Sequence, residues 1–181
     1  QVGRVYPIKN YETTILALQH LPKSLKYVIV GEEEKNNHYS DYKQSLIDLA
    51  KSLGVEKQLV FTGQVRGVDK YYLLKHAQMM VHMALWESFC NVVHEGMSQG
   101  LTCIVADNTA LPLLIKDGVN GYCVDTKDSN TLAQKINYIL ENKTSQLVKS
   151  MESLNRKIGL EDSWAKVAAK MNTLYKQQVQ K

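Results

Sequence analysis

Two glutamates stand eight positions apart where a polar loop leads into a predicted helix. Glu87 begins this stretch, and Glu95 lies one turn into the helix. The apolar runs 79–85 before it and 101–106 after it are typical of buried strands. In α/β proteins, a strand, a polar loop and a helix N-terminus in this order form ligand sites at the carboxyl edge of a parallel sheet. We therefore expect these residues to lie at the centre of a ligand site.

The same stretch and the other loops that follow predicted strands supply groups that bind anions. Backbone amides at the helix start would carry about half a unit of positive charge. These amides belong to Phe89, Cys90, Asn91 and Val92. Three further loops bring cations and backbone groups to the same edge, namely Arg4, Lys9, Gly31, Val65 and Arg66. Because arginine binds phosphate bidentately and lysine binds it as a point charge, this combination favours a diphosphate.

The two carboxylates need a different ligand, because they repel phosphate. A carboxylate accepts hydrogen bonds from sugar hydroxyls, as an acidic residue does with ribose in dinucleotide-binding folds. A diphosphate between two such carboxylates is the outline of a nucleotide-sugar. Simpler interpretations stay open: Arg4 and Lys9 as solvated surface charges, and Glu87 and Glu95 as a dipole-facing and a surface carboxylate. We interpret His82, Met83 and Trp86 as packing residues rather than catalytic ones. His94 is interpreted as a packed or surface histidine, because its place in the helical pattern points it away from the edge.

Short apolar runs alternate with amphipathic stretches along the whole chain. Strands are predicted at 25–30, 58–61, 79–85, 102–106 and 122–124, and residues 1–5 are typical of the end of another. A loop is predicted at 32–38. Helices are predicted at 10–21, 42–53, 69–77, 91–99, 128–140 and 163–178, with a helical turn at 112–116 and a polar, linker-like piece before the last helix. This alternation predicts an α/β, Rossmann-like doubly wound parallel sheet with helices on both faces.

Composition narrows the possible functions. The chain has 181 residues, 44% hydrophobic and 22% charged, which suits one globular core. The net charge of +4 comes from scattered cations without interleaved aromatic residues, so we expect no nucleic-acid partner. No run approaches the roughly 20 apolar residues of a membrane span, and no signal peptide opens the sequence. Cys90, Cys103 and Cys123 lack metal-binding spacing, so we expect thiols in a reducing compartment, no metal and no cofactor.

Five short motifs, taken together, resemble a known family. They are Gly3-Arg4-Val5 followed by Lys9-Asn10, Val28-Ile29-Val30-Gly31, the run 60–65, the Glu87 and Glu95 pair with seven residues between them, and Asp117-Gly118-Val119-Asn120-Gly121. In this order and spacing they resemble the C-terminal, nucleotide-sugar-binding domain of GT-B glycosyltransferases, in particular the large retaining group called family 4. The resemblance covers nearly the whole chain.

The resemblance implies a role for each predicted site residue. Arg4 and Lys9 would bind the diphosphate and stabilise it as it leaves, which is catalysis by preorganised charge. Glu87 would contact hydroxyls of the transferred sugar, and the amides of residues 89–92 would hold sugar and phosphate. Glu95 would take the ribose hydroxyls. Transfer would proceed with retention and without a metal.

The donor base would lie near Gln64, Val65 and Arg66, and the resemblance favours a UDP-sugar with a GDP-sugar as the alternative. The sequence departs from the family pattern at two places. Cys90 stands where the family often has glycine, so the backbone there has less conformational freedom. Residues 109–113 replace a Gly-Gly-x-Pro-Glu stretch, which weakens that loop as a sugar site.

The resemblance also implies that the acceptor is held elsewhere. Enzymes of this family carry a second, N-terminal domain, and the start at Gln1 without methionine is typical of a fragment. We expect residues 1–160 to form the donor domain and the helix in 161–181 to pack toward the other domain, which would bring a glycan, lipid or small-molecule acceptor. The chain alone would bind the donor and transfer little sugar. The expected location is cytoplasmic, with peripheral contact at the inner face of a membrane left open.

Two other functions remain alternatives. One is a nucleotide-sugar epimerase of the same two-domain architecture, which a product assay would distinguish. The other is a non-catalytic nucleotide-binding module with a flavodoxin-like strand order, which the order of the strands would distinguish.

Overall fold

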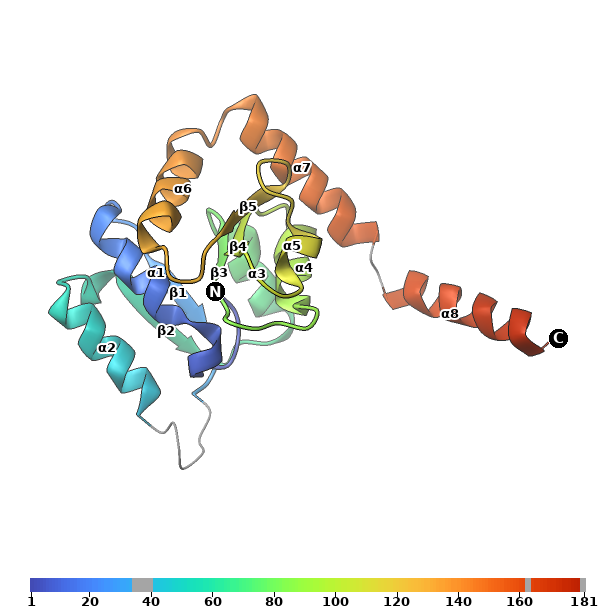
Figure 1. The fold of residues 1–181 in the computed structure, drawn as a ribbon, viewed down its shortest axis with the longest axis horizontal. Helices are drawn as coiled ribbons and strands as arrows, with labels where there is room; N and C mark the ends of the chain where they lie inside the picture. The colour runs from blue at the N-terminus through green and yellow to red at the C-terminus, as the bar shows by residue number, and fades with distance from the viewer. Residues whose placement is uncertain (34–40, 162–163, 180–181) are drawn as a thin grey trace.

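The computed structural model describes residues 1–33, 41–161 and 164–179, and its strands form two parallel ladders (Figure 1). In one, β1 (Tyr27–Val30) pairs with β2 (Leu59–Gly63). In the other, the order is β3 (Met80–His82), β4 (Cys103–Ala106) and β5 (Gly121–Val124). The predicted α/β class with parallel strands is confirmed. Residues 34–38 of the predicted loop and Ser163 of the predicted helix lie outside the described residues.

The first residues run along the free edge of β1, as a further parallel strand would. Val30 donates its amide to the carbonyl of Gln1 and accepts the amide of Gly3, both at 2.9 Å. Val2 forms a parallel bridge with Val30. Gly31 permits this approach, because a Cβ there would lie 1.9 Å from the Gly3 carbonyl oxygen. If this N-terminal segment is counted as the first strand, β1 and β2 are the second and third. They are direct neighbours, as in the Rossmann order 3-2-1, whereas the flavodoxin order 2-1-3 separates the second and third strands.

Helices cover both sides of the strands. Those that contact one another on one side are α1 (Tyr11–Ala17), α2 (Tyr42–Ser52) and α6 (Ser129–Glu141). The others of the body are α3 (Gly67–His76), α4 (Asn91–Ser98), α5 (Leu111–Leu114) and α7 (Gln146–Glu161). Figure 1 shows α3, α4 and α5 on the opposite side from α1 and α2. Three short 3-10 helices complete the described elements: η1 (Pro7–Lys9), η2 (Leu18–His20) and η3 (Glu56–Gln58).

The prediction of a polar linker before the last helix is wrong. These residues form α7, which packs on α4 and buries Val148, Met151 and Asn155 at helical spacing. The strand predicted at 79–85 is also shorter than expected. β3 ends at His82, and residues 83–85 leave the ladder to enter the site. Other boundaries differ by a few residues, as is usual for helix and strand ends.

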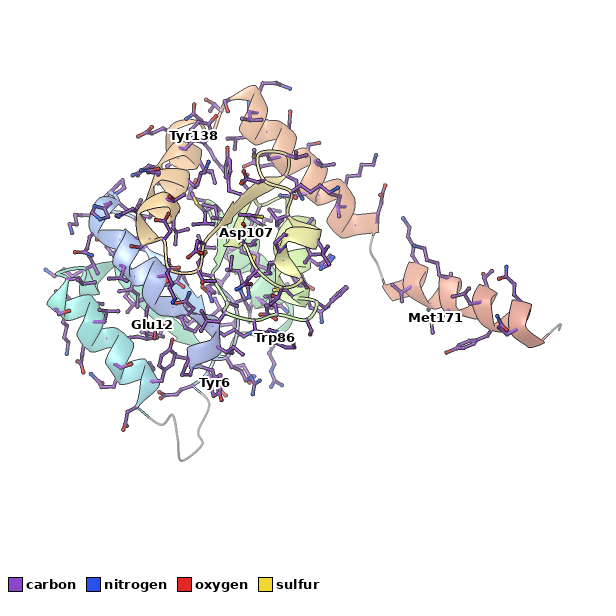
Figure 2. All side chains as sticks on the ribbon, in the orientation of Figure 1. Tyr6, Glu12, Trp86, Asp107, Tyr138 and Met171 are labelled. Atoms are coloured by element: carbon purple, nitrogen blue, oxygen red, sulfur yellow. The ribbon has the colours of Figure 1, made fainter. Side chains whose placement is uncertain are left out.

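The last helix, α8 (Trp164–Val179), projects away from the body (Figure 1). Every residue from 165 to 178 is exposed, including Met171, which Figure 2 shows well apart from the side chains of the body. Among the described helices, none combines the length and apolarity that crossing a bilayer requires.

A cavity of about 700 Å³ lies near the starts of β1 and β3, lined by residues such as Tyr27, Leu74 and Met80. None of the predicted site residues lines it. Because ligands of this fold class bind at the carboxyl ends of the strands, the candidate site is expected among the polar groups at that edge and not in this cavity.

Candidate functional site

Two side chains from different elements meet at one carboxylate oxygen of Glu87, which lies on the loop between β3 and α4. Lys9 closes η1, and its Nζ contacts Oε1 of Glu87. His82 ends β3 and places Nε2 2.8 Å from the same oxygen. The side chains of Lys9 and Glu87 are 19% and 13% exposed, and that of His82 is fully buried. The sequence predicts Lys9 and Glu87 as site residues, and the structure brings them into direct contact. For His82 the sequence predicts only a packing role.

These contacts set the charges in the cluster. Burial acts to raise the pKa of Glu87, but hydrogen bonds from His82 and Lys9 and the Lys9 charge lower it to about 2. Burial lowers the pKa of His82 below its usual 6.5, against the effect of Glu87. Burial and the Glu87 carboxylate raise the pKa of the Cys90 thiol to about 12. At neutral pH the cluster therefore contains a carboxylate, a neutral imidazole and a thiol.

The loop that carries Glu87 is held by the loop after β4. Asn108 donates Nδ2–H to the carbonyls of Ala84 and Leu85, at 3.2 and 2.9 Å. The Glu87 amide donates to Oγ1 of Thr109 at 3.1 Å. Sequence reasoning considers residues 109–113 only as a weakened sugar site and misses this supporting function. The available signal is a pair of short polar side chains directly after a buried strand.

Asn10 holds the same region from the other side. It adopts a left-handed conformation, φ 49° and ψ 61°, between η1 and α1. Its Nδ2 donates to the carbonyls of Met83 and Thr126, at 2.9 and 2.8 Å. Asn10 occupies the N-cap position of α1, but its side chain makes no capping hydrogen bond and instead joins the loops after β3 and β5. Lys9 is thereby fixed beside Glu87.

The start of α4 faces this cluster. Its N-cap is Cys90, in a left-handed conformation with φ 62° and ψ 64°. The first amides of a helix have no partner within the helix, so the amides predicted to bind an anion lie at a terminus that can present them. The four residues concerned are Phe89 and Asn91, which are exposed, Val92, which is half-buried, and Cys90, which is buried.

Two aromatic groups flank the helix start. Phe89 is 55% exposed and stacks on His94 at 4.9 Å between ring centroids. The sequence predicts a packing role for Trp86, which is wrong, since Trp86 is 57% exposed. Met83 and His94 agree with the prediction, the first fully buried and the second half-buried beside Phe89.

The second glutamate has a lysine of its own. Oε1 of Glu95 lies 2.6 Å from Nζ of Lys70 on α3, and the two side chains are 22% and 20% exposed. The other oxygen, Oε2, is buried without a hydrogen-bond partner in the described structure. Sequence reasoning misses Lys70. The structure thus separates the two carboxylates, each with its own lysine, along the start of α4.

The remaining predicted residues lie on neighbouring loops. Arg4 is exposed in the N-terminal segment, where Tyr11 donates its hydroxyl to the carbonyls of Gly3 and Arg4 at 3.0 Å. Gly31 donates its amide to the Gly63 carbonyl at 2.9 Å, so its role is to join two loops closely. Val65 is half-buried, and Arg66 is exposed at the N-cap of α3, the helix that carries Lys70.

Three groups of the cluster have atoms that could bind a metal. His82, Glu87 and Cys90 offer one nitrogen, one oxygen and one sulfur within 4.8 Å of one another. However, the Lys9 ammonium already pairs with the same carboxylate, and the raised pKa of Cys90 opposes thiolate formation. These groups are therefore better described as a hydrogen-bonded cluster, and the absence of a resident metal stays a prediction.

The comparisons with known protein families and sequences agree on one family. The model of a family described as glycosyl transferases group 1 matches residues 1–158. An uncharacterized glycosyltransferase of Methanocaldococcus jannaschii is 31% identical over 141 residues, which cover 77% of this chain and 34% of that protein. The chain spans about a third of the length of the curated relatives it matches.

Solved structures give the same fold. The Anabaena protein HepE in complex with UDP-glucose superposes with a TM-score of 0.80 at 26% identity, covering 88% of this chain and 43% of that one. Sucrose-phosphate synthase from Thermosynechococcus elongatus superposes with a TM-score of 0.88 at 22% identity, covering 98% of this chain and 45% of that one.

Proposed function

Because the chain belongs to the glycosyl transferases group 1 family, we propose that it is the donor-binding part of a retaining, family 4 type glycosyltransferase. It would hold a nucleoside diphosphate sugar for transfer to a glycan, lipid or small-molecule acceptor. The observation that carries the proposal is the meeting of Lys9 and Glu87 beside the start of α4. The likeness to a protein solved with UDP-glucose favours a UDP-sugar over a GDP-sugar.

The division of roles follows from charge and position. Lys9 and Arg4 would bind the diphosphate together with the amides of residues 89–92. Lys9 retains hydrogen-bonding capacity for this, because an ammonium has three donors and Glu87 takes one. Glu87 would accept hydrogen bonds from hydroxyls of the transferred sugar. Its side chain stays ionised because its pKa is lowered to about 2. As the diphosphate leaves, the same cations would stabilise its negative charge, and no metal would be needed.

The nucleoside would lie toward α3. Glu95 would accept hydrogen bonds from the ribose hydroxyls, and Lys70 would fix the orientation of the Glu95 carboxylate. The base would lie near Val65 and Arg66, at the loop before α3. Gly31 would contribute close backbone packing rather than a side-chain contact, since it joins the loop after β1 to that after β2.

The acceptor would be bound by a part of the whole protein outside this chain, consistent with the chain's share of its relatives' length. Residues 1–160 would act as the donor domain. The helix α8 would contact the acceptor domain through Val167, Met171, Leu174 and Tyr175, which are all exposed here. The chain alone would therefore bind donor and transfer little or no sugar.

Calorimetric titration with UDP, GDP and ADP tests donor binding. We expect UDP to bind, and Lys9→Ala to weaken binding by about 1–3 kcal/mol, the range for hydrogen bonds to charged groups. Lys51→Ala is the matched control, because Lys51 is 61% exposed on α2 and pairs only with Asp48 among the contacts described for it. No binding of any nucleotide at millimolar concentration, or equal affinity of Lys9→Ala and wild type, would contradict the proposal.

The reaction type needs the complete natural protein. Incubation with donor and acceptor, followed by NMR of the anomeric proton, distinguishes retention from inversion. Formation of an epimeric sugar without transfer would support the epimerase alternative instead.

A further inference from the structure

His82 is a buried histidine whose ring has one hydrogen-bond partner among the described residues, Glu87. Its side chain is fully buried at the carboxyl end of β3, with Nε2 2.8 Å from Oε1 of Glu87. The other ring nitrogen, Nδ1, is buried without a hydrogen-bond partner in the described part of the chain. A buried ring nitrogen that carried a proton without an acceptor would be costly. The proton of His82 therefore belongs on Nε2, where the carboxylate accepts it.

Burial keeps this imidazole neutral. A protonated ring would place an N–H on Nδ1 at a buried position without an acceptor in the described structure, and burial accordingly lowers the pKa of His82. At physiological pH, His82 is thus a fixed neutral donor. It differs in this from Lys9, which reaches the same oxygen with a charge and a flexible side chain.

We infer that His82 is a positioning residue, which orients the Glu87 carboxylate for the sugar of the donor. Its rigid ring holds Oε1 from the protein interior while Lys9 holds the same oxygen from η1, and neither of these contacts uses the second oxygen, Oε2. The inference rests on the proposed donor binding and deepens it. His82 itself does not touch the donor, and the sequence gives it no motif.

The inference separates two parts of the ligand. UDP binding requires the protein groups that would hold the diphosphate and the nucleoside, and His82 makes no described contact with these groups. UDP-glucose in addition requires a correctly oriented Glu87. Loss of His82 should therefore reduce the affinity for UDP-glucose but not for UDP, whereas a general loss of folding would reduce both.

The test compares His82→Leu, which removes the donor, with His82→Gln, which keeps an Nε2–H. We expect His82→Leu to weaken UDP-glucose binding about tenfold, the effect of losing one hydrogen bond to a charged group, and to change UDP binding less than twofold. His82→Gln should recover most of the loss. Thr102→Val is the control, since Thr102 is buried and its hydroxyl has no recorded partner.

A second measurement does not depend on the ligand. Nitrogen-15 NMR of the His82 ring should show the neutral Nε2–H tautomer, and carbon-13 NMR should show a higher Glu87 pKa in His82→Leu. Equal loss of both ligands, equal behaviour of the two His82 variants, or an Nδ1–H tautomer would overturn the inference. If wild type binds no UDP, the donor function fails, while the NMR measurements still decide whether His82 positions Glu87.

Discussion

Glu87 and Glu95 raise an electrostatic question at the scale of single residues, because two carboxylates stand where a diphosphate would bind. The structure pairs each with a lysine, Glu87 with Lys9 and Glu95 with Lys70. Each pair is close to neutral, so the carboxylates keep their lone pairs for hydroxyl groups without repelling an anion strongly. The positive end of α4 then adds a net attraction. A site of this composition suits a ligand that has both phosphates and sugars.

The acidity of Glu87 gives a prediction at the same scale. Its pKa of about 2 in the folded chain lies below the usual 4.5, so the ionised form stabilises the fold. This stabilisation is complete above pH 4.5 and is lost as the pH falls toward 2. We expect the carbon-13 signal of the Glu87 carboxyl to show no inflection near pH 4.5. The groups that face it, Lys9 and His82, account for the shift.

The corresponding stability measurement uses Glu87→Gln. Urea unfolding should find wild type more stable by up to about 3 kcal/mol above pH 4.5, since one pKa unit corresponds to roughly 1.4 kcal/mol. The difference should shrink as the pH approaches 3. The other carboxylates titrate in both proteins, so their contributions cancel in the difference between the two unfolding free energies. A constant difference between pH 7 and pH 3, or a Glu87 midpoint near 4.5, would show that the three-group contact does not persist in solution.

At the scale of elements, the position of α4 depends on a helix that the sequence does not predict. α7 packs on α4, and Asn155 of α7 is fully buried. Asn155 donates to the carbonyls of Leu101 and Asn120, at 2.8 and 2.7 Å, and accepts from the Asn120 side chain at 2.9 Å. It thereby fixes α7 to the loops before β4 and β5.

Replacing Asn155 should therefore be costly. In Asn155→Ala, two buried carbonyls and the Asn120 amide lose partners, and we expect a loss of about 2–4 kcal/mol, given 1–3 kcal/mol per unsatisfied buried group. Thermal or urea unfolding measures the change. Asn130→Ala is the control, because Asn130 is exposed in the first turn of α6. A loss no larger than that of the control would mean that α7 does not pack as described.

The helices α4 and α7 and the contact around Glu87 explain where sequence interpretation succeeds and where it fails. The helix at Asn91 was predictable, because Val93 and Met97 lie on one face and Gly100 follows the end. In α7 one of the three buried positions is an asparagine, so the apolar pattern of this helix is broken at a core position. Lys9 and Glu87 could be predicted from motifs at strand ends, but their contact with His82 depends on tertiary packing between η1 and β3 that no local spacing records.

At the scale of the whole molecule, α8 presents an apolar face with no counterpart in the body. Val167, Met171, Leu174 and Tyr175 recur at helical spacing and are 43–62% exposed. A face of this kind usually marks an interaction site. The chain spans about a third of its curated relatives, so we propose that another part of the whole protein covers it.

This proposal predicts a difference between the chain alone and the complete natural protein. In the chain alone, Met171→Ser with Leu174→Ser should change the unfolding free energy by no more than about 0.5 kcal/mol, because exposed positions contribute little. In the complete protein the same change should destabilise by roughly 2 kcal/mol or more, through lost burial of two large side chains, and should lower transfer activity. UDP affinity should stay unchanged in both. Asn172→Ser, on an exposed position of the same helix, is the control. An equal effect in both forms of the protein would mean that α8 packs within the donor domain or on nothing at all.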